Sequence, residues 1–205
     1  MKRRALIVID VQNEYINGNF LIEYPPVETS LPQIEKAIDS AHAAGIPVVA
    51  VQHILPSDAP VFAKGSVGAE LHPVVADRPC DLLVTKTLPS VFSASEFAPW
   101  LKENEIDTLA IIGYMTHNCN DSTAREAMHR GFDVEVLADA AGSLPYKNNG
   151  GIASAEEIYR VTLTIMESAY AAVTTTDQWI ARLTDQTEAP RDNIFFSNQR
   201  ALGKM

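Results

Sequence analysis

The chain has 205 residues, a formal net charge of −10 and a hydrophobic content of 46%. Nucleic-acid-binding proteins usually present a basic face, and the basic run here is confined to Lys2–Arg4, so nucleic acid is not an expected partner. The apolar run that follows ends at Asp10 and is too short for an export signal or a membrane span. The chain has two cysteines, Cys80 and Cys119. Together these features predict a cytoplasmic protein without a structural disulfide or a membrane partner.

Strand-like and helix-like patterns alternate along the chain, which has no linker-like segment and is predicted to form a single domain over residues 1–205. Apolar or alternating runs predict strands over residues 5–9, 46–52, 82–85, 108–112, 133–137 and 171–175. Helical spacing predicts helices over residues 30–45, 95–104, 154–168 and 177–183, and a further one that starts near Cys119 and ends at Gly131. Ser30 with Gln33, and Ser154 with Glu157, have the spacing of capping boxes.

Repeated strand–helix units build parallel sheets with helices on both faces. The pattern therefore predicts an α/β protein, a three-layer αβα sandwich around a mainly parallel six-stranded sheet. Ligands of such sheets bind beyond the carboxyl ends of the strands. Asp10, His53, Lys86 and the turn 113–119 each follow a strand directly, so we expect all four to meet at one edge of the sheet.

Cys119 follows a buried strand and lies at the start of a helix, which Thr116 or Asn118 can cap. Unpaired backbone N–H groups at a helix start favour the thiolate, which predicts a reactive cysteine. The alternative is a small apolar residue that fills the space between helix and sheet. Cys80, in the sequence Arg-Pro-Cys-Asp, is interpreted as a thiol without chemistry.

Two segments depart from the alternation. Residues 54–81 are rich in proline and glycine and too long for an ordinary connection, which predicts a functional loop or lid over the site. The tail 185–205 is polar except for Ile194, Phe195 and Phe196. It is either a disordered end or a segment that packs on a partner subunit of a homo-oligomer, a dimer or tetramer.

Five motifs occur in order along the chain: ALIVIDVQNEY around Asp10, GSVGAELHP in the long loop, VTKTLPSVFSAS around Lys86, IIGYMTHNC at Cys119 and VLADAAGS after the fifth strand. Together they resemble those of the isochorismatase-like cysteine hydrolases, the superfamily of nicotinamidase and N-carbamoylsarcosine amidase. The resemblance covers most of the chain and implies an isochorismatase-like, Rossmann-like sheet topology.

The resemblance implies a catalytic triad of Asp10, Lys86 and Cys119 that hydrolyses a C–N bond. Cys119 is then the nucleophile, Asp10 accepts its proton and later protonates the leaving amine, and Lys86 stabilises the thiolate and holds Asp10. The acyl-thioester on Cys119 is hydrolysed by water. The resemblance also implies an oxyanion hole from the backbone N–H groups of Met115 and Cys119, with a cis peptide bond between Tyr114 and Met115.

Six further side chains are candidates for contact with substrate: Gln12, Tyr15, Phe20, Tyr114, His117 and Asn120. Gln12 is also placed to orient the Asp10 loop, the aromatic residues fit a core equally well, and His117 is favoured as a turn residue that faces solvent. Asn120 stands where the family usually has a small aliphatic residue. Asp139 matches the family's ADA motif and is interpreted as support for the cysteine loop.

Nicotinamidases of this superfamily carry a metal site with an Asp-x-His pair, which the segment VQHILPSDAP lacks. His53 and His72 are therefore not expected to bind metal, and we expect no cofactor. The isochorismatase branch itself cleaves a vinyl ether without a cysteine nucleophile, so Cys119 favours C–N hydrolysis. Carbamoyl compounds, maleamate-like acids, ureido compounds and lactams all remain open as substrates. The alternatives from other classes are a non-catalytic binding protein on this fold and a thiol redox protein that uses Cys119.

Overall fold

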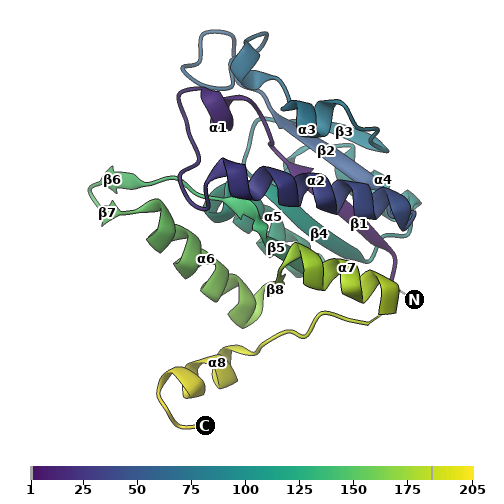
Figure 1. Cartoon of the computed structure of the whole chain (residues 1–205), viewed down its shortest axis with the longest axis vertical. Helices are drawn as coiled ribbons and strands as arrows, with labels where there is room; N and C mark the ends of the chain where they lie inside the picture. The colour runs from purple at the N-terminus through teal and green to yellow at the C-terminus, as the bar shows by residue number, and fades with distance from the viewer. Residues whose placement is uncertain (1, 186) are drawn as a thin grey trace.

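Six parallel strands form the central sheet of the computed structural model, which describes residues 2–185 and 187–205 (Figure 1). The strand order is β3-β2-β1-β4-β5-β8. The strands are Arg4–Ile9 (β1), Val48–His53 (β2), Leu82–Lys86 (β3), Thr108–Tyr114 (β4), Asp133–Gly142 (β5) and Ala172–Thr174 (β8). The predicted α/β architecture is confirmed, and every pairing in this sheet is parallel.

Helices cover both faces of the sheet because successive residues of a strand point to opposite faces. In β1, Leu6 and Val8 belong to one hydrophobic core, which also contains residues of α2 (Val27–Ala43) and α7 (Thr176–Asp185). Ile7 and Ile9 belong to the other core, with residues of α4 (Phe97–Glu103), α5 (Asp121–His129) and α6 (Ala155–Ala169). Figure 1 shows α2 and α7 together in front of the sheet. These layers form the predicted sandwich.

Shorter elements lie in the connections. They are α1 (Glu14–Asn17), α3 (Pro73–Ala76), the 3-10 turns η1 (Val67–Ala69) and η2 (Val91–Ser93), the π-helical turn η3 (Thr116–Asn120), the hairpin strands β6 (Tyr146–Asn148) and β7 (Gly151–Ala153), and α8 (Ile194–Ala201).

The first long helix begins earlier than the sequence pattern predicts. It starts at Val27 after Pro26, and Pro32 lies inside it. The predicted Ser30–Gln33 capping box is therefore wrong, because Ser30 is a buried residue within the helix. Its hydroxyl instead lies 2.7 Å from the hydroxyl of Tyr114. The second predicted box, Ser154 with Glu157, is confirmed at the start of α6.

The cysteine segment also differs from the prediction. Neither Thr116 nor Asn118 caps a helix; both belong to η3, and the Thr116 hydroxyl donates to the carbonyl oxygen of Gly142. That carbonyl is available because β5 continues to Gly142, beyond the predicted end at Leu137, after a register shift against β4. The predicted strand pattern stopped early because Asp139 interrupts the apolar run.

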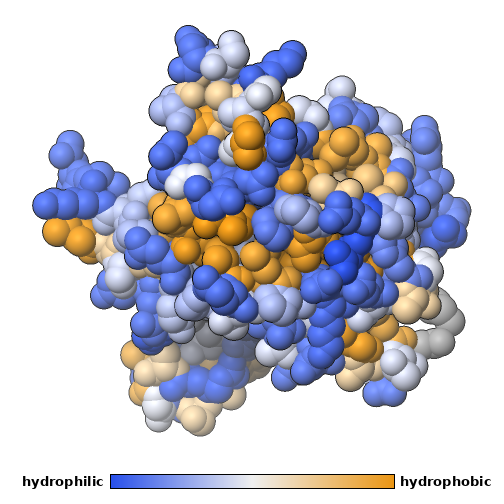
Figure 2. Space-filling model, turned by 45° about the horizontal axis from the view of Figure 1, so that its top comes forward, coloured by the Kyte–Doolittle hydropathy of each residue, from blue (hydrophilic) through white to orange (hydrophobic). Residues whose placement is uncertain are grey.

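Two projections flank the carboxyl edge of the sheet. Residues 54–81 form a lobe with η1 and α3, and the antiparallel β6–β7 hairpin, which the sequence pattern did not predict, projects from the body on the left of Figures 1 and 2. Figure 2 shows hydrophobic residues on the face between these two projections.

No helix in the described part of the chain combines the length and the apolar character that crossing a membrane requires. The predicted cytoplasmic location stays a prediction.

Candidate active site

Asp10 is the first polar residue after β1 and is completely buried. Its backbone is in the left-handed region, with φ at 51°, which residues other than glycine rarely adopt. Its N–H donates to the carbonyl oxygen of Val51 at 3.0 Å, so the turn is tied to β2. Such conformations persist where the surrounding structure enforces them, and they cluster at functional sites.

Lys86 ends β3 and reaches the Asp10 carboxylate across the end of β2, which lies between β3 and β1. Its Nζ donates to Asp10 Oδ2 at 2.7 Å and lies 3.3 Å from Cys119 Sγ. Both side chains of this ion pair are fully buried. The lysine thus joins the carboxylate to the sulfur.

Cys119 lies in η3, between β4 and α5, and is 3% exposed. Its Sγ lies within 4.8 Å of an Asp10 carboxylate oxygen. Asp10 Oδ1 is buried and has no hydrogen-bond partner among the described residues. A buried acceptor without a partner is costly, and the Cys119 thiol is close enough to the Asp10 carboxylate to lower its pKa by a side-chain hydrogen bond.

The electrostatics of the site favour a protonated cysteine at rest. Burial raises the pKa of the Cys119 thiol to about 12, and the Asp10 carboxylate adds to this, against the opposing effect of Lys86. The expectation that the helix start favours a resting thiolate is therefore wrong, because desolvation outweighs it. Burial also raises the pKa of Asp10, although Lys86 lowers it. A carboxyl group with a raised pKa is a better proton acceptor from a thiol.

The backbone ahead of Cys119 has the geometry that the family resemblance implies. The peptide bond between Tyr114 and Met115 is cis. The Met115 carbonyl oxygen accepts from the N–H groups of Asn118 and Asn120, at 3.1 and 3.2 Å. Within residues 2–185 and 187–205, the Met115 N–H itself has no acceptor.

Gln12 holds the main chain at the edge of the site. It is completely buried, and its amide donates to the carbonyl oxygens of His53 and Ala69, at 2.9 and 2.7 Å. Its Oε1 accepts from the His53 N–H at 2.8 Å. Both ends of the Gln12 amide are thus occupied by backbone groups. Gln12 is therefore a positioning residue, as the interpretation that it orients the Asp10 loop predicts, and not a substrate ligand.

Aromatic rings form a wall beside the polar group. The Tyr15 ring lies 5.0 Å from Phe62, 5.6 Å from Tyr114 and 6.0 Å from Phe20, measured between centroids. Burial raises the pKa of Tyr15, and the nearby Cys119 and Asp10 raise it further. The Tyr114 hydroxyl is bound to Ser30, so this side chain anchors β4 to α2.

The interpretation of His117 as a turn residue that faces solvent is wrong, because both of its ring nitrogens contact other side chains. Its Nδ1 lies 2.9 Å from Ser143 Oγ, and its Nε2 lies 3.0 Å from the hydroxyl of Tyr146 on the hairpin. Burial lowers the pKa of His117 to about 4. Tyr146 was missed in the sequence because no local pattern marks the hairpin.

Asn120 and Asp139 both support the fold in ways that the sequence did not specify. Asn120 is buried, its Nδ2 donates to the Gly113 carbonyl oxygen at 2.9 Å, and its Oδ1 has no partner among the described residues. Asp139 does not support the cysteine loop; its Oδ1 accepts from the N–H and hydroxyl of Thr176, where α7 begins. That correction follows from the extension of β5 towards α7.

His53 is the residue of the site that sequence reasoning left without a role. Its Nδ1 lies 3.1 Å from Lys86 Nζ, whereas His72 caps α3 by accepting from the Val74 N–H. Asp10, His53 and Cys119 form a group with the right atoms for a metal ion. All three side chains contact the Lys86 ammonium, which therefore supplies the positive charge at their centre.

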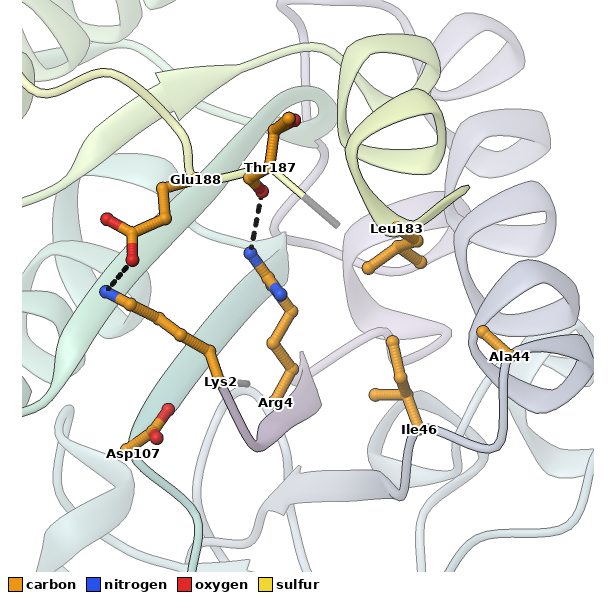
Figure 3. Close-up of a pocket in the computed structure, with 8 residues that line it drawn as sticks. All are labelled: Lys2, Arg4, Ala44, Ile46, Asp107, Leu183, Thr187 and Glu188. Carbon is orange, nitrogen blue, oxygen red and sulfur yellow. Dashed lines mark hydrogen bonds and ion pairs between the residues drawn. The ribbon is translucent and has the colours of Figure 1, made fainter. Parts of the chain in front are cut away.

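A surface cavity of about 670 Å³ lies at the opposite, amino-terminal edge of the sheet (Figure 3). Lys2 and Arg4 project into it, but Lys2 pairs with Asp133 and Glu188, and Arg4 pairs with Glu135. Since these cations are already neutralised, the cavity does not resemble an anion site.

The chain is similar in sequence and fold to several known proteins. Residues 4–178 match the family model described as the isochorismatase domain. The crystal structure of an isochorismatase-type protein from Burkholderia xenovorans LB400 is 54% identical, with a TM-score of 0.98 over 99% of this chain and 98% of that one. The secreted isochorismatase effector Isc1 of Verticillium dahliae is 34% identical over 67% of this chain and 72% of its own length. Nicotinamidase of Escherichia coli K12 is 26% identical over 68% of this chain and 83% of its own length.

Proposed function

Because the chain belongs to the isochorismatase family, we propose that it is a cysteine hydrolase that cleaves a C–N bond of a small molecule through an acyl-thioester on Cys119. The observation that carries the proposal is the contact of one buried ammonium, Lys86 Nζ, with both Asp10 Oδ2 and Cys119 Sγ. Nicotinamidase, a relative by sequence, is by its name an amidase, which supports this class of reaction.

In the proposed first half-reaction, Cys119 Sγ attacks the amide carbon as Asp10 takes the thiol proton. The Lys86 ammonium stabilises the sulfur while it carries negative charge. The backbone N–H groups of Met115 and Cys119 are the proposed donors to the carbonyl oxygen, and one such donor typically contributes about 3–4 kcal/mol to the transition state. The C–N bond then breaks, and the amine nitrogen takes the proton from Asp10.

In the second half-reaction, a water molecule attacks the thioester carbon and gives a proton to Asp10. The C–S bond breaks, the sulfur recovers the proton, and the acid product leaves. The sum is hydrolysis of an amide to a carboxylic acid and an amine or ammonia. Asp10 needs a raised pKa for both transfers, and burial provides it.

The two alternatives from other classes fit the site less well. A binding protein that had lost catalysis has no need for a buried Asp–Lys pair against a cysteine, since burying these charges is costly. A redox role needs a second thiol close to Cys119. Cys80 is exposed and precedes β3, whereas Cys119 lies at the carboxyl edge of the sheet, so β3 separates the two.

The test is a panel of carbamoyl, ureido, maleamate-like, lactam and simple aromatic amides, assayed for release of ammonia or amine. Cys119→Ala and Asp10→Asn should abolish turnover of any amide that the unchanged protein hydrolyses, while Cys80→Ala should not affect it. A thioester should be trapped by mass spectrometry as an acyl adduct on the Cys119 peptide. Full activity of Cys119→Ala would refute the mechanism.

A further inference from the structure

His53 lies at the end of the strand that separates the proposed base from the lysine. β2 lies between β1 and β3 in the sheet, and His53 is the register partner of Lys86. Register partners in neighbouring strands point to the same face. The two side chains are therefore neighbours because of the sheet itself.

We infer that His53 is a positioning residue that holds the Lys86 ammonium between Asp10 and Cys119, an inference that rests on the proposed function of these three residues. An ammonium group has three N–H donors. Its acceptors here are Asp10 Oδ2 at 2.7 Å, His53 Nδ1 at 3.1 Å and Cys119 Sγ at 3.3 Å. With three acceptors in fixed directions, the ammonium has one orientation, and His53 provides the one contact that takes no part in the chemistry.

His53 is itself fixed by two other segments. Gln12, from the turn after β1, binds both the N–H and the carbonyl oxygen of His53. Phe62, from the 54–81 lobe, lies edge-on to the imidazole with 5.5 Å between ring centroids. Phe62 is 4% exposed and has a left-handed backbone with φ at 51°. Gln12 thus fixes the backbone of His53 and Phe62 packs on its half-buried ring, an arrangement typical of a built site rather than of accidental packing.

The charge of His53 suits this role. Burial and the adjacent Lys86 ammonium lower the pKa of His53 to about 4. The imidazole is therefore neutral at working pH, Nδ1 is the acceptor, and the proton is on Nε2. The titratable groups that face it are Lys86, Asp10 and Cys119.

Two substitutions separate an acceptor role from simple packing. His53→Asn keeps an acceptor close to the position of Nδ1, and His53→Leu fills the space without one. His129→Leu is the matched control, because His129 is an exposed residue at the end of α5. The measurements are the rate of iodoacetamide labelling of Cys119 at about pH 9 and, for an amide that the protein hydrolyses, kcat and KM.

If His53 positions the ammonium, His53→Leu slows Cys119 labelling about tenfold, because the thiolate loses an aligned cation. It lowers kcat by about 10- to 100-fold with KM nearly unchanged. His53→Asn restores most of both, and His129→Leu changes neither. Equal labelling and kcat in His53→Leu and the unchanged protein would overturn the inference, as would equal losses in the Leu and Asn variants.

A measurement on the unchanged protein covers the case in which His53→Leu does not fold. The ¹⁵N shifts of the His53 ring should show the neutral form with the proton on Nε2 from neutral pH down to about pH 5. A proton on Nδ1, or titration near the ordinary value of 6.5, would overturn the inference. If the protein hydrolyses none of the amides, the proposed activity fails, whereas the labelling and NMR results still decide the role of His53.

Discussion

The hydroxyl of Ser30, inside α2, lies 2.7 Å from the hydroxyl of Tyr114, the last residue of β4. Both residues are completely buried, and Tyr114 directly precedes Met115, the proposed oxyanion donor. Burial raises the pKa of Tyr114 to about 12, so the phenol keeps its proton. The pair thus connects the helical layer to the turn that carries the site.

We expect Ser30→Ala to lower the free energy of unfolding by about 1–3 kcal/mol, because it leaves a buried phenol without its partner. Urea unfolding followed by circular dichroism measures this. Ser30→Ala combined with Tyr114→Phe removes both polar groups and should cost less than Ser30→Ala alone. Equal stability of Ser30→Ala and the unchanged protein would contradict the importance of the pair.

The raised pKa of Cys119 predicts how stability changes at high pH. The folded thiol titrates at about 12, whereas an unfolded one titrates near 9.0, so the unfolded state loses its proton first. The stabilisation is complete below pH 9 and is lost as the pH rises from about 9 to 12. Subtracting the free energy of unfolding of Cys119→Ala, measured over the same pH range, isolates the contribution of Cys119 from those of other groups. If the free energy of unfolding falls equally steeply above pH 9 in both proteins, the pKa of the thiol is not perturbed.

The same pKa predicts the order of labelling by iodoacetamide at neutral pH. Cys80 is exposed, and Cys119 is buried and protonated, so Cys80 should react first. A bound substrate analogue or a rise in pH is needed before Cys119 reacts. Peptide mass spectrometry distinguishes the two sites, and faster labelling of Cys119 than of Cys80 at neutral pH would refute the protonated resting state.

Lys86→Met should destabilise the fold by about 3–5 kcal/mol, because the buried Asp10 carboxylate loses its counter-ion. Without Lys86, the pKa of Asp10 rises further. The loss of stability caused by Lys86→Met should therefore become smaller as the pH falls and the Asp10 carboxyl group takes up a proton. Adding Asp10→Asn to Lys86→Met should recover part of the stability at neutral pH. Urea unfolding at neutral and acid pH tests all three variants.

The tail is predicted to mediate self-association. α8 has no buried residue, and Ile194, Phe195 and Phe196 are 66%, 60% and 47% exposed. A helix of eight residues that buries none of its side chains is unstable by itself in water, so we expect a second copy of the chain to cover it. Phe195→Ser with Phe196→Ser should lower the sedimentation coefficient, while Lys204→Ser should not. A monomeric unchanged protein would contradict the prediction.

The sequence predicted the sheet well because its signals are local. The buried strands are continuous apolar runs, and a polar residue after such a run identifies the edge where Asp10, Lys86 and Cys119 meet. The order of the strands in the sheet does not follow from local sequence patterns, so the sequence did not indicate a role for His53. His53 comes next to Lys86 and Asp10 because β2 lies between β3 and β1.

Other parts of the site depend on contacts between distant segments. Phe62 reaches the imidazole of His53 from a loop without a regular pattern, and Tyr146 reaches His117 from an unpredicted hairpin. The prediction of a Cys119 thiolate failed for a related reason. The start of a helix, with its favourable dipole, can be predicted from the sequence, but the desolvation of the thiol by the folded core cannot.

The strand order also has a consequence for how the proposed active site is lost when the protein unfolds. Asp10 and the cysteine turn follow β1 and β4, the two central strands, each paired on both sides. Central strands usually open only when the whole domain unfolds, whereas edges and hairpins open locally. Asp10 and Cys119 therefore share the global unfolding cooperativity of the core, whereas Lys86 ends the edge strand β3, which opens more locally. Amide hydrogens of β1 should exchange with solvent far more slowly than those of the β6–β7 hairpin.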